Sequence, residues 1–472
     1  MRIKMMKIRG TWEMGRFRHD VLLLAVNFIN GLTMAVLFGL CWFGFYSDKI
    51  FIPFYFYGDL YIIALFGVIY FLLCGAYDAF EISLQRISET FYSQVLALSI
   101  TDVILYCVTC LLERRAAAVV PLLGTFFAQI LAAVLWSIVA SRWYFASFRP
   151  KRSAIVYNGR FEIDRLIEHY GLEKKFQIDF MIDVERCIED LSVLRGMEAV
   201  FLSDVRSSDR NTILKYCVER DIEVYMTPRI GDTIMNGARQ VHMFHLPMLQ
   251  VGRYHPSPLY LFLKRTFDIL LSALALIALS PVLLATAAAI KLEDGGPVFY
   301  TQERLTKNGR IFHIHKFRSM CVDAERDGVA RLSSGEHDDR ITPVGHFIRR
   351  TRIDELPQLF DILRGDLAIV GPRPERPEIA KQYEETMPEF RLRLQAKAGL
   401  TGYAQVYGKY NSRPYDKLRM DLMYIARPSI FEDLRICIAT VKILFVPEST
   451  EGVAEGQATA MDEHTEREKT KV

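Results

Sequence analysis

The stretch KRTFDILLSALALIALSPVLLATAAAIK, residues 264–291, determines how this chain meets a membrane. It contains the uncharged run Ile269–Ile290, 22 residues long, with Ser280-Pro281 near its middle. As one straight helix the run would reach roughly 33 Å and cross the bilayer. Proline removes a backbone hydrogen bond and bends a helix, so two arms of about 18 and 14 Å would instead enter one leaflet and return on the same side.

Charge at the two ends helps to distinguish these arrangements. Lys264-Arg265 precede the run and Lys291 follows it, and both ends of a re-entrant helix would meet anionic headgroups. A crossing helix would put the region before it and the charged region around Asp354 on opposite faces of the membrane. We therefore expect a re-entrant helix over residues 266–290, with a spanning helix as the alternative.

Four earlier runs are long and apolar enough to span a membrane, and the only charged residue within them is Asp102. Basic residues gather before the first run and after the fourth, which predicts that both ends lie in the cytoplasm. We expect residues 1–148 to form a four-helix transmembrane region with an uncleaved first helix. Asp102 is costly at membrane depth, so it should face other helices, with Gln129 as a candidate partner. The four runs are Val21–Phe45, Leu60–Tyr77, Phe91–Leu112 and Ala116–Ala140.

Residues 149–255 alternate short β-branched runs with amphipathic stretches, which predicts a small parallel α/β module of Rossmann-like type. A dinucleotide site would need the G-x-G-x-x-G fingerprint after the first strand, and the segment 157–161 supplies only Gly159. We therefore expect no bound dinucleotide. The predicted strands are 154–157, 177–182, 199–202 and 222–226.

Residues 297–318 form two β-rich stretches around Asn308-Gly309, a strong hairpin signal. His313 and His315 share one face of the second strand. Without a third ligand, packed or solvated histidines are a better account of the pair than a metal site. Lys316 and Arg318 would either join a phosphate site or form a solvated basic face. The eight scattered cysteines suggest neither disulfides nor zinc.

Asp354 and Glu355 are adjacent acids in the run RRTRIDELPQ, residues 349–358. Neighbouring carboxylates repel unless positive charge resolves them, as arginines, a divalent metal and a phosphorylated substrate together would do. The alternative is a solvated helix start. We expect a short helix over Leu356–Leu363, stopped by Gly365, with Asp354 at or near its N-cap.

A second cationic element is GPRPERP, residues 371–377, in which three prolines stiffen the backbone around Arg373 and Arg376. A stiff loop can hold a guanidinium in place for bidentate contact with phosphate.

Taken in order, these residues resemble the bacterial sugar transferase family, the monotopic polyprenyl-phosphate sugar-1-phosphate transferases. The resemblance covers roughly residues 260–446, and the four-helix start with a degenerate α/β module is similar to the large members of that family. It implies a monotopic catalytic domain over 256–446. The matching segments are Lys264-Arg265 with Asp268, Ser280-Pro281, Gly296–Phe299, Lys316–Met320, Asp354–Gln358, Gly371–Pro374 and Gly399–Gly402.

The resemblance implies transfer of a sugar 1-phosphate from a UDP-sugar to undecaprenyl phosphate, with release of UMP, as the first step of exopolysaccharide, capsule or O-antigen repeat-unit synthesis. Asp354 would attack the β-phosphate and form an aspartyl-phosphosugar intermediate, and Glu355 with Asp354 would hold Mg²⁺. Lys264 and Arg265 would approach the polyprenyl phosphate, and Arg373 with Lys316 or Arg318 would bind the nucleotide phosphates. The further substrate-binding candidates are Arg304, Arg352 and Arg376.

Two other functions remain open: a membrane-anchored nucleotide-sugar dehydratase, against which the missing glycine fingerprint argues, and a non-catalytic scaffold of polysaccharide assembly. With a net charge of only +3 over 472 residues we expect no nucleic-acid partner. We also expect a homo-oligomer, such as a dimer, in the bacterial cytoplasmic membrane with the catalytic domain on the cytoplasmic face. Residues 447–472 are expected to be a disordered tail. Glucose, galactose and N-acetylated hexosamines all remain open as the sugar.

Overall fold

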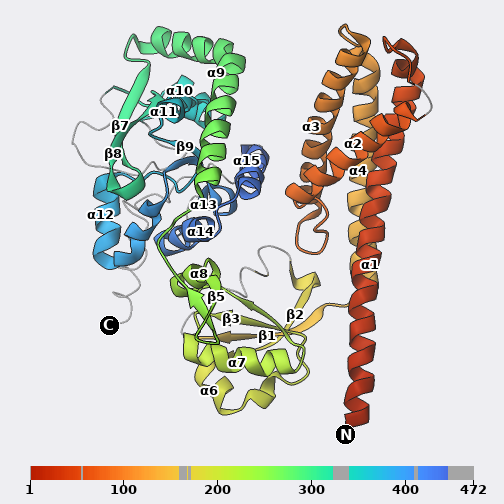
Figure 1. Ribbon diagram of the computed structural model, residues 1–472, viewed down its shortest axis with the longest axis vertical. Helices are drawn as coiled ribbons and strands as arrows, with labels where there is room; N and C mark the ends of the chain where they lie inside the picture. The colour runs from red at the N-terminus through yellow and green to blue at the C-terminus, as the bar shows by residue number, and fades with distance from the viewer. Residues whose placement is uncertain are drawn as a thin grey trace. The chain divides into compact units, whose positions relative to one another are not determined.

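The computed structural model describes residues 2–54, 57–158, 167, 172–322, 340–408 and 413–444. It divides into two compact units, Met1–Thr227 and Pro228–Val472, each shown in Figure 1. The predicted tail at 447–472 lies outside the described residues.

The first unit begins with the helices expected from the apolar runs. They are α1 (Arg2–Cys41), α2 (Gly58–Ala76), α3 (Ile87–Glu113) and α4 (Val119–Ser147). Together with α9 (Pro258–Asp294), they make five helices, among the described residues, that are long and apolar enough to cross a membrane. The chain therefore has the helices of a membrane protein, as predicted.

Asp102 is buried in the first unit, as expected for a carboxylate on a membrane helix. The contact with Gln129 is not made: within the described part of the chain, both carboxylate oxygens of Asp102 and both amide atoms of Gln129 lack a hydrogen-bond partner. One set of interhelical polar contacts involves Asn30, which donates to Gln94 at 3.5 Å and accepts from the Tyr70 hydroxyl at 2.9 Å.

The rest of the first unit holds a four-stranded sheet in the order β2-β1-β3-β4, with every neighbouring pair parallel. Helices α6 (Val184–Glu189) and α7 (Ser207–Glu219) contribute Cys187 and Ile213 to its core. The predicted alternation of strands and helices is confirmed. The Rossmann-like classification and the absence of a dinucleotide stay predictions, and most of the segment 157–161 lies outside the described residues. The strands are β1 (Lys151–Tyr157), β2 (Phe176–Asp183), β3 (Ala199–Ser203) and β4 (Glu223–Met226).

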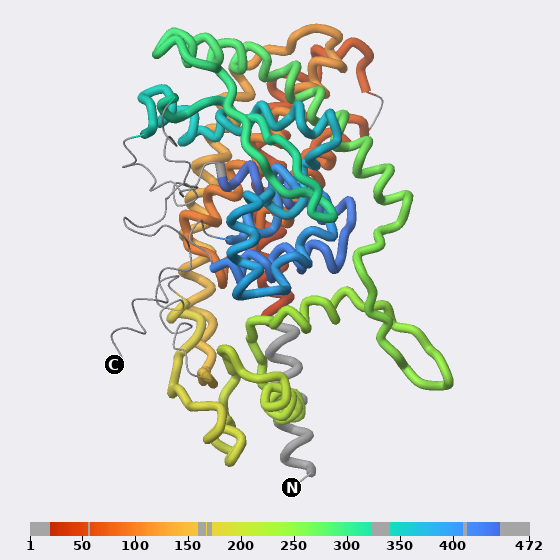
Figure 2. Tube along the Cα trace, turned by 90° about the vertical axis from the view of Figure 1, so that its left-hand side faces the viewer, coloured from red at the N-terminus to blue at the C-terminus, as the bar shows by residue number. Residues whose placement is uncertain are grey.

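The second unit begins at Pro228, earlier than the boundary expected near residue 256. Helix α8 (Ile230–Asn236) packs on α14 (Pro414–Ala426) and buries Ile230 in the core of the second unit. Next comes the hairpin of β5 (Arg239–Met243) and β6 (Leu246–Gln250), whose residues are exposed except for half-buried Val241. It projects as a light green loop in Figure 2. The α/β module therefore ends at β4.

Helix α9 is a single helix whose ribbon bends into two arms in Figure 1. Pro281 lies inside it and cannot donate to the carbonyl of Ile277, four residues earlier. The Ser280 hydroxyl donates to that carbonyl at 2.8 Å. Such a replacement matters in hydrocarbon, where an unpaired carbonyl costs several kcal/mol. The predicted bend is thus present, and α9 exposes apolar side chains on both sides of it, including Leu274, Ile277 and Leu284.

The hairpin after α9 is confirmed: β7 (Phe299–Leu305) and β8 (Ile311–Phe317) pair antiparallel, and both Asn308 and Gly309 have positive φ. Residues from β8, α11, β9 and α14 share one hydrophobic core in the second unit, which places the strand and helix that flank the candidate site against each other. The remaining elements are α10 (Pro343–Arg350), the 3₁₀ turn η7 (Ile353–Glu355), α11 (Gln358–Arg364), β9 (Ala368–Val370), α12 (Pro377–Thr386), η8 (Pro388–Gln395), β10 (Gly399–Thr401), α13 (Tyr403–Tyr407) and α15 (Ile430–Leu444).

Candidate active site

Asp354 and Glu355 lie in η7, the 3₁₀ turn between α10 and α11. Arg352 has a left-handed backbone, with φ 57°, which turns the chain into η7. The helix that follows starts at Gln358, two residues later than expected, and ends at Gly365 as predicted. Asp354 is therefore not the cap of α11, and the positive field at the two acids comes from side chains.

Glu355 is held by two cations. Its Oε1 accepts from the Lys316 ammonium at 2.7 Å and lies 3.4 Å from the Arg373 guanidinium. Burial pushes the pKa of Glu355 upward, but Lys316, Arg373 and Arg352 outweigh burial and hold it well below its usual range. Glu355 is therefore ionised at neutral pH.

The pKa of Asp354 is shifted in the opposite direction, upward. Burial raises its pKa to about 6, and the charge of Glu355 adds to the rise, while Lys316, Arg349 and Arg352 oppose it. Its Oδ1 is buried and, among the described residues, has no hydrogen-bond partner. One acid is thus fixed and charged, while its neighbour keeps a carboxylate oxygen available.

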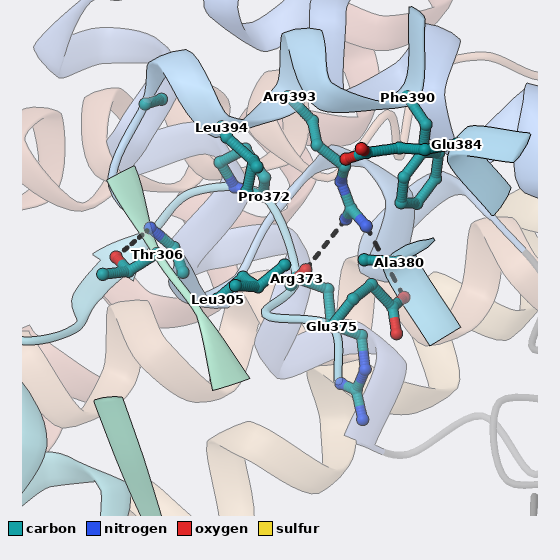
Figure 3. A pocket seen from close by; sticks show the side chains of 12 residues that line it. Leu305, Thr306, Pro372, Arg373, Glu375, Ala380, Glu384, Phe390, Arg393 and Leu394 are labelled. Atoms are coloured by element: carbon teal, nitrogen blue, oxygen red, sulfur yellow. Dashed lines mark hydrogen bonds and ion pairs between the residues drawn. The ribbon is translucent and has the colours of Figure 1, made fainter. Parts of the chain in front are cut away.

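The loop that carries Arg373 is held by close backbone packing and by a buried arginine. A Cβ at Gly371 would collide with the backbone near Gly399, so the two glycine-rich motifs lie directly against each other. Arg393 donates to the carbonyl of Arg373 at 2.8 Å and lies 2.7 Å from a carboxylate oxygen of Asp421. Figure 3 shows Arg393 reaching between Arg373 and Glu375 at the edge of a small pocket.

Arg304 and Arg376 belong to the same region. Arg304 donates to the carbonyl of Pro374 at 3.1 Å, beneath the loop, and the positive charges of Arg373 and Arg376 act on it. Arg376 lies 3.8 Å from Glu378 at the start of α12. These two residues add positive charge beside Arg373.

Lys264 and Arg265 contact groups within the protein, and their expected contact with polyprenyl phosphate stays a prediction. Lys264 is only 11% exposed and lies 3.1 Å from Asp433, a carboxylate that also accepts from two tyrosine hydroxyls. Arg265 donates to the carbonyls of Ile362 and Leu363 at 2.6 and 2.8 Å. A cation at a helix C-terminus satisfies carbonyls that the helix leaves unpaired, so Arg265 joins α9 to the end of α11.

Arg318 also differs from the sequence expectation. It is 7% exposed, pairs with Asp294 through both terminal nitrogens, and donates from Nε to the carbonyl of Pro297 at 2.6 Å. It anchors the end of α9 to β8. Of the predicted substrate-binding residues, the structure therefore brings Lys316, Arg352 and Arg373 to the two acids.

Sequence reasoning missed three contributors. Arg349 lies in the arginine cluster and acts on Asp354, but was not singled out as a site residue. Arg393 gave no signal, because it lies in an ordinary polar segment. His315 was noted only for its strand face, and its contact with Asp361 depends on the packing of β8 against α11.

The pair of acids fits a hard cation such as Mg²⁺. Such ions take oxygen ligands and keep several positions for water and substrate phosphates. The Oδ1 of Asp354 has no hydrogen-bond partner among the described residues, and the next residue supplies a second carboxylate. In the part of the chain that the structure describes, no group of three or more His, Cys, Asp or Glu side chains is arranged to hold a metal. The two acids would therefore share the ion with phosphate oxygens.

Comparison with known proteins identifies the class. The bacterial sugar transferase profile matches residues 259–447. The putative undecaprenyl-phosphate N-acetylgalactosaminyl 1-phosphate transferase of Bacillus subtilis is 42% identical over 156 residues, which are 33% of this chain and 82% of that protein. The chain therefore belongs to the bacterial sugar transferase family.

Longer relatives are also similar to this chain. The UDP-N-acetylgalactosamine-undecaprenyl-phosphate N-acetylgalactosaminephosphotransferase of Aeromonas hydrophila is 38% identical over 262 residues, 54% of this chain and 60% of the relative. The UDP-glucose:undecaprenyl-phosphate glucose-1-phosphate transferase of Escherichia coli K12 is 38% identical over 212 residues, 44% of each chain. The matched segments thus span about half the length of these relatives.

Proposed function

We propose that this protein transfers a sugar 1-phosphate from a UDP-sugar to undecaprenyl phosphate, giving undecaprenyl-diphosphate-sugar and UMP. The reaction would begin the assembly of an exopolysaccharide, capsule or O-antigen repeat unit. The observation that carries the proposal is the arrangement of the two acids: Glu355 contacts Lys316 and Arg373, and the neighbouring Asp354 has a buried oxygen without a hydrogen-bond partner among the described residues. Family membership and the names of the relatives support the same chemistry.

The proposed reaction has two displacements. A carboxylate oxygen of Asp354 attacks the phosphorus that carries the sugar, the bond from that phosphorus to the UMP oxygen breaks, and UMP leaves. The undecaprenyl phosphate oxygen then attacks the same phosphorus and releases the Asp354 carboxylate. Splitting the transfer lets a soluble donor and a lipid acceptor use one site in turn.

The cations supply what a carboxylate needs to attack an anionic diphosphate. Lys316 and Arg373 already converge on Glu355, and Arg352 and Arg349 act on Asp354. Preorganised positive charge of this kind supplies much of the acceleration in phosphoryl transfer. Mg²⁺, held by Asp354 and Glu355, would neutralise further charge on the diphosphate oxygens.

The membrane part of the proposal is that α9 enters the inner leaflet and returns. Its bend, its exposed apolar side chains and its internally satisfied Ile277 carbonyl support this arrangement. A re-entrant α9 would keep Asp354 on the cytoplasmic face, where UDP-sugars are found. Self-association, as a dimer, remains part of the proposal and is measurable by mass photometry of the detergent-solubilised protein.

The test is UMP release by the purified protein across a panel of UDP-sugars with undecaprenyl phosphate. We expect one or a few donors to be used, and D354N to lose both UMP release and lipid-linked product while still inserting into membranes. Normal turnover by D354N would contradict the role of Asp354. No UMP release from any donor by the wild-type protein would favour the scaffold, and NAD-dependent conversion of a UDP-sugar would favour the dehydratase.

A further inference from the structure

A buried carboxylate that the proposed reaction does not use lies close to the site. Asp361, on α11, is 1% exposed and contacts His315 of β8 through both of its oxygens. Oδ2 accepts from the backbone N–H of His315 at 2.9 Å, and Oδ1 lies 2.6 Å from Nδ1 of the ring. Because a carboxylate only accepts, Nδ1 carries the proton.

This two-point contact is directional in a way that apolar packing is not. Burial raises the pKa of Asp361, and the two hydrogen bonds from His315 oppose that rise. The contact fixes both where β8 lies along α11 and how the strand is rotated. If Asp361 lost these partners, its carboxylate would stay buried with nothing to offset the lost hydration. The contact therefore opposes any arrangement that separates His315 from Asp361.

The next residue of the strand is the cation of the candidate site. Neighbouring residues of a strand point to opposite faces, so His315 reaches Asp361 while Lys316 reaches Glu355. Strand β8 therefore meets the segment from η7 to α11 at two points, 315–361 and 316–355. A slip of one residue would exchange the two side chains, and the His315–Asp361 contact opposes that slip.

We propose that His315 and Asp361 are positioning residues, which hold the Lys316 ammonium on Glu355 and so set the metal affinity of the acid pair. The inference rests on the proposed function. His313 offers a matched control on the same strand face: it is 63% exposed and lies 3.7 Å from Glu303.

The test compares H315L, H315N and D361N with the control H313N, measuring UMP release, the Mg²⁺ concentration for half-maximal activity, and Mg²⁺ binding without substrates by titration calorimetry. An asparagine amide can donate from near the position of Nδ1. We expect H315L and D361N to lower kcat/KM by about tenfold to a hundredfold and to raise the Mg²⁺ requirement. H315N should recover part of the loss, and H313N should match the wild type. Melting curves show which variants are folded.

A second readout separates positioning from general stability. In a K316Q background, H315L should lower activity by less than about twofold further, because its effect passes through Lys316. The inference would be overturned, with the proposed function intact, if the activity loss in the double variant equalled the product of the two single losses. An unchanged Mg²⁺ requirement in a folded H315L or D361N would overturn it as well. Absence of UMP release by the wild-type protein would instead remove the proposed function, and this inference with it.

Discussion

At the scale of single residues, the central feature is that two adjacent acids in one turn have different environments. Glu355 accepts from Lys316 and lies next to Arg373, while Asp354 has a buried oxygen without a hydrogen-bond partner in the described part of the chain. A charged, fixed acid suits a metal ligand, and a carboxylate with a raised pKa suits a nucleophile, because basicity and nucleophilicity rise together.

Replacing Glu355 separates these two roles. E355Q removes the charge that Lys316 and Arg373 hold, so we expect UMP release to fall by about a hundredfold or more, with part of the loss relieved by excess Mg²⁺. The measurement is the Mg²⁺ dependence of initial rates. E303Q, at an exposed acid on β7, is the control. An unchanged Mg²⁺ dependence in E355Q would exclude Glu355 from the metal site.

The raised pKa of Asp354 predicts the acid limb of the pH profile. The carboxyl must be ionised to attack or to bind a cation, and its pKa is about 6 instead of 3.8. At limiting Mg²⁺ the rate should therefore fall about tenfold for each pH unit below 6 and level off above it. Excess Mg²⁺ should move the limb to lower pH. A flat rate between pH 4.5 and about 7 would contradict this assignment.

At the scale of elements, α9 is held at both ends by the cations that sequence reasoning had assigned to substrate. Arg265 reaches the last carbonyls of α11, Lys264 reaches Asp433 on α15, and Arg318, the residue after β8, pairs with Asp294. Whether a basic side chain has a structural or a substrate role depends on its partners in the tertiary structure. The neighbouring sequence does not reveal those partners. Position in the motif therefore did not predict these contacts, and the substrate roles of these residues stay predictions.

Arg265 tests this structural role. R265Q loses charged hydrogen bonds to Ile362 and Leu363, so we expect the free energy of unfolding to fall by about 1.5–3 kcal/mol. The KM for undecaprenyl phosphate should stay within about twofold of wild type at a temperature where the variant is folded. Denaturation in detergent and steady-state kinetics provide the two values. A large rise in KM with unchanged stability would restore the substrate role.

The bend of α9 predicts its topology. With single cysteines at Leu259 and Leu292 in a cysteine-free background, an impermeant thiol reagent should label both positions from the cytoplasmic side only. P281L restores the missing hydrogen bond and favours a straight helix of roughly 33 Å in its apolar part, so the Leu292 cysteine should become partly accessible from the other side. A285L is the control. If the cysteines at Leu259 and Leu292 were labelled from opposite sides in the protein that keeps Pro281, α9 would be a spanning helix.

At the scale of the whole molecule, the sequence predicted those features that depend on local pattern. Uncharged runs located the membrane helices, β-branched runs located the four parallel strands, and Asn308-Gly309 located the β7–β8 hairpin. The start of the second unit at Pro228 was missed, because Ile230 is buried by packing on distant α14 and no break in composition marks the boundary. The partners of Lys264, Arg318 and Asp361 were missed for the same reason.

The most direct measurement is mass spectrometry of the purified protein after incubation with Mg²⁺ and the preferred UDP-sugar, without lipid acceptor. We predict release of UMP up to one equivalent and a sugar-phosphate adduct on the peptide that contains Asp354, which undecaprenyl phosphate then removes. The adduct should be absent from D354N. UMP released only when the lipid acceptor is present, or an adduct on another residue, would contradict the account.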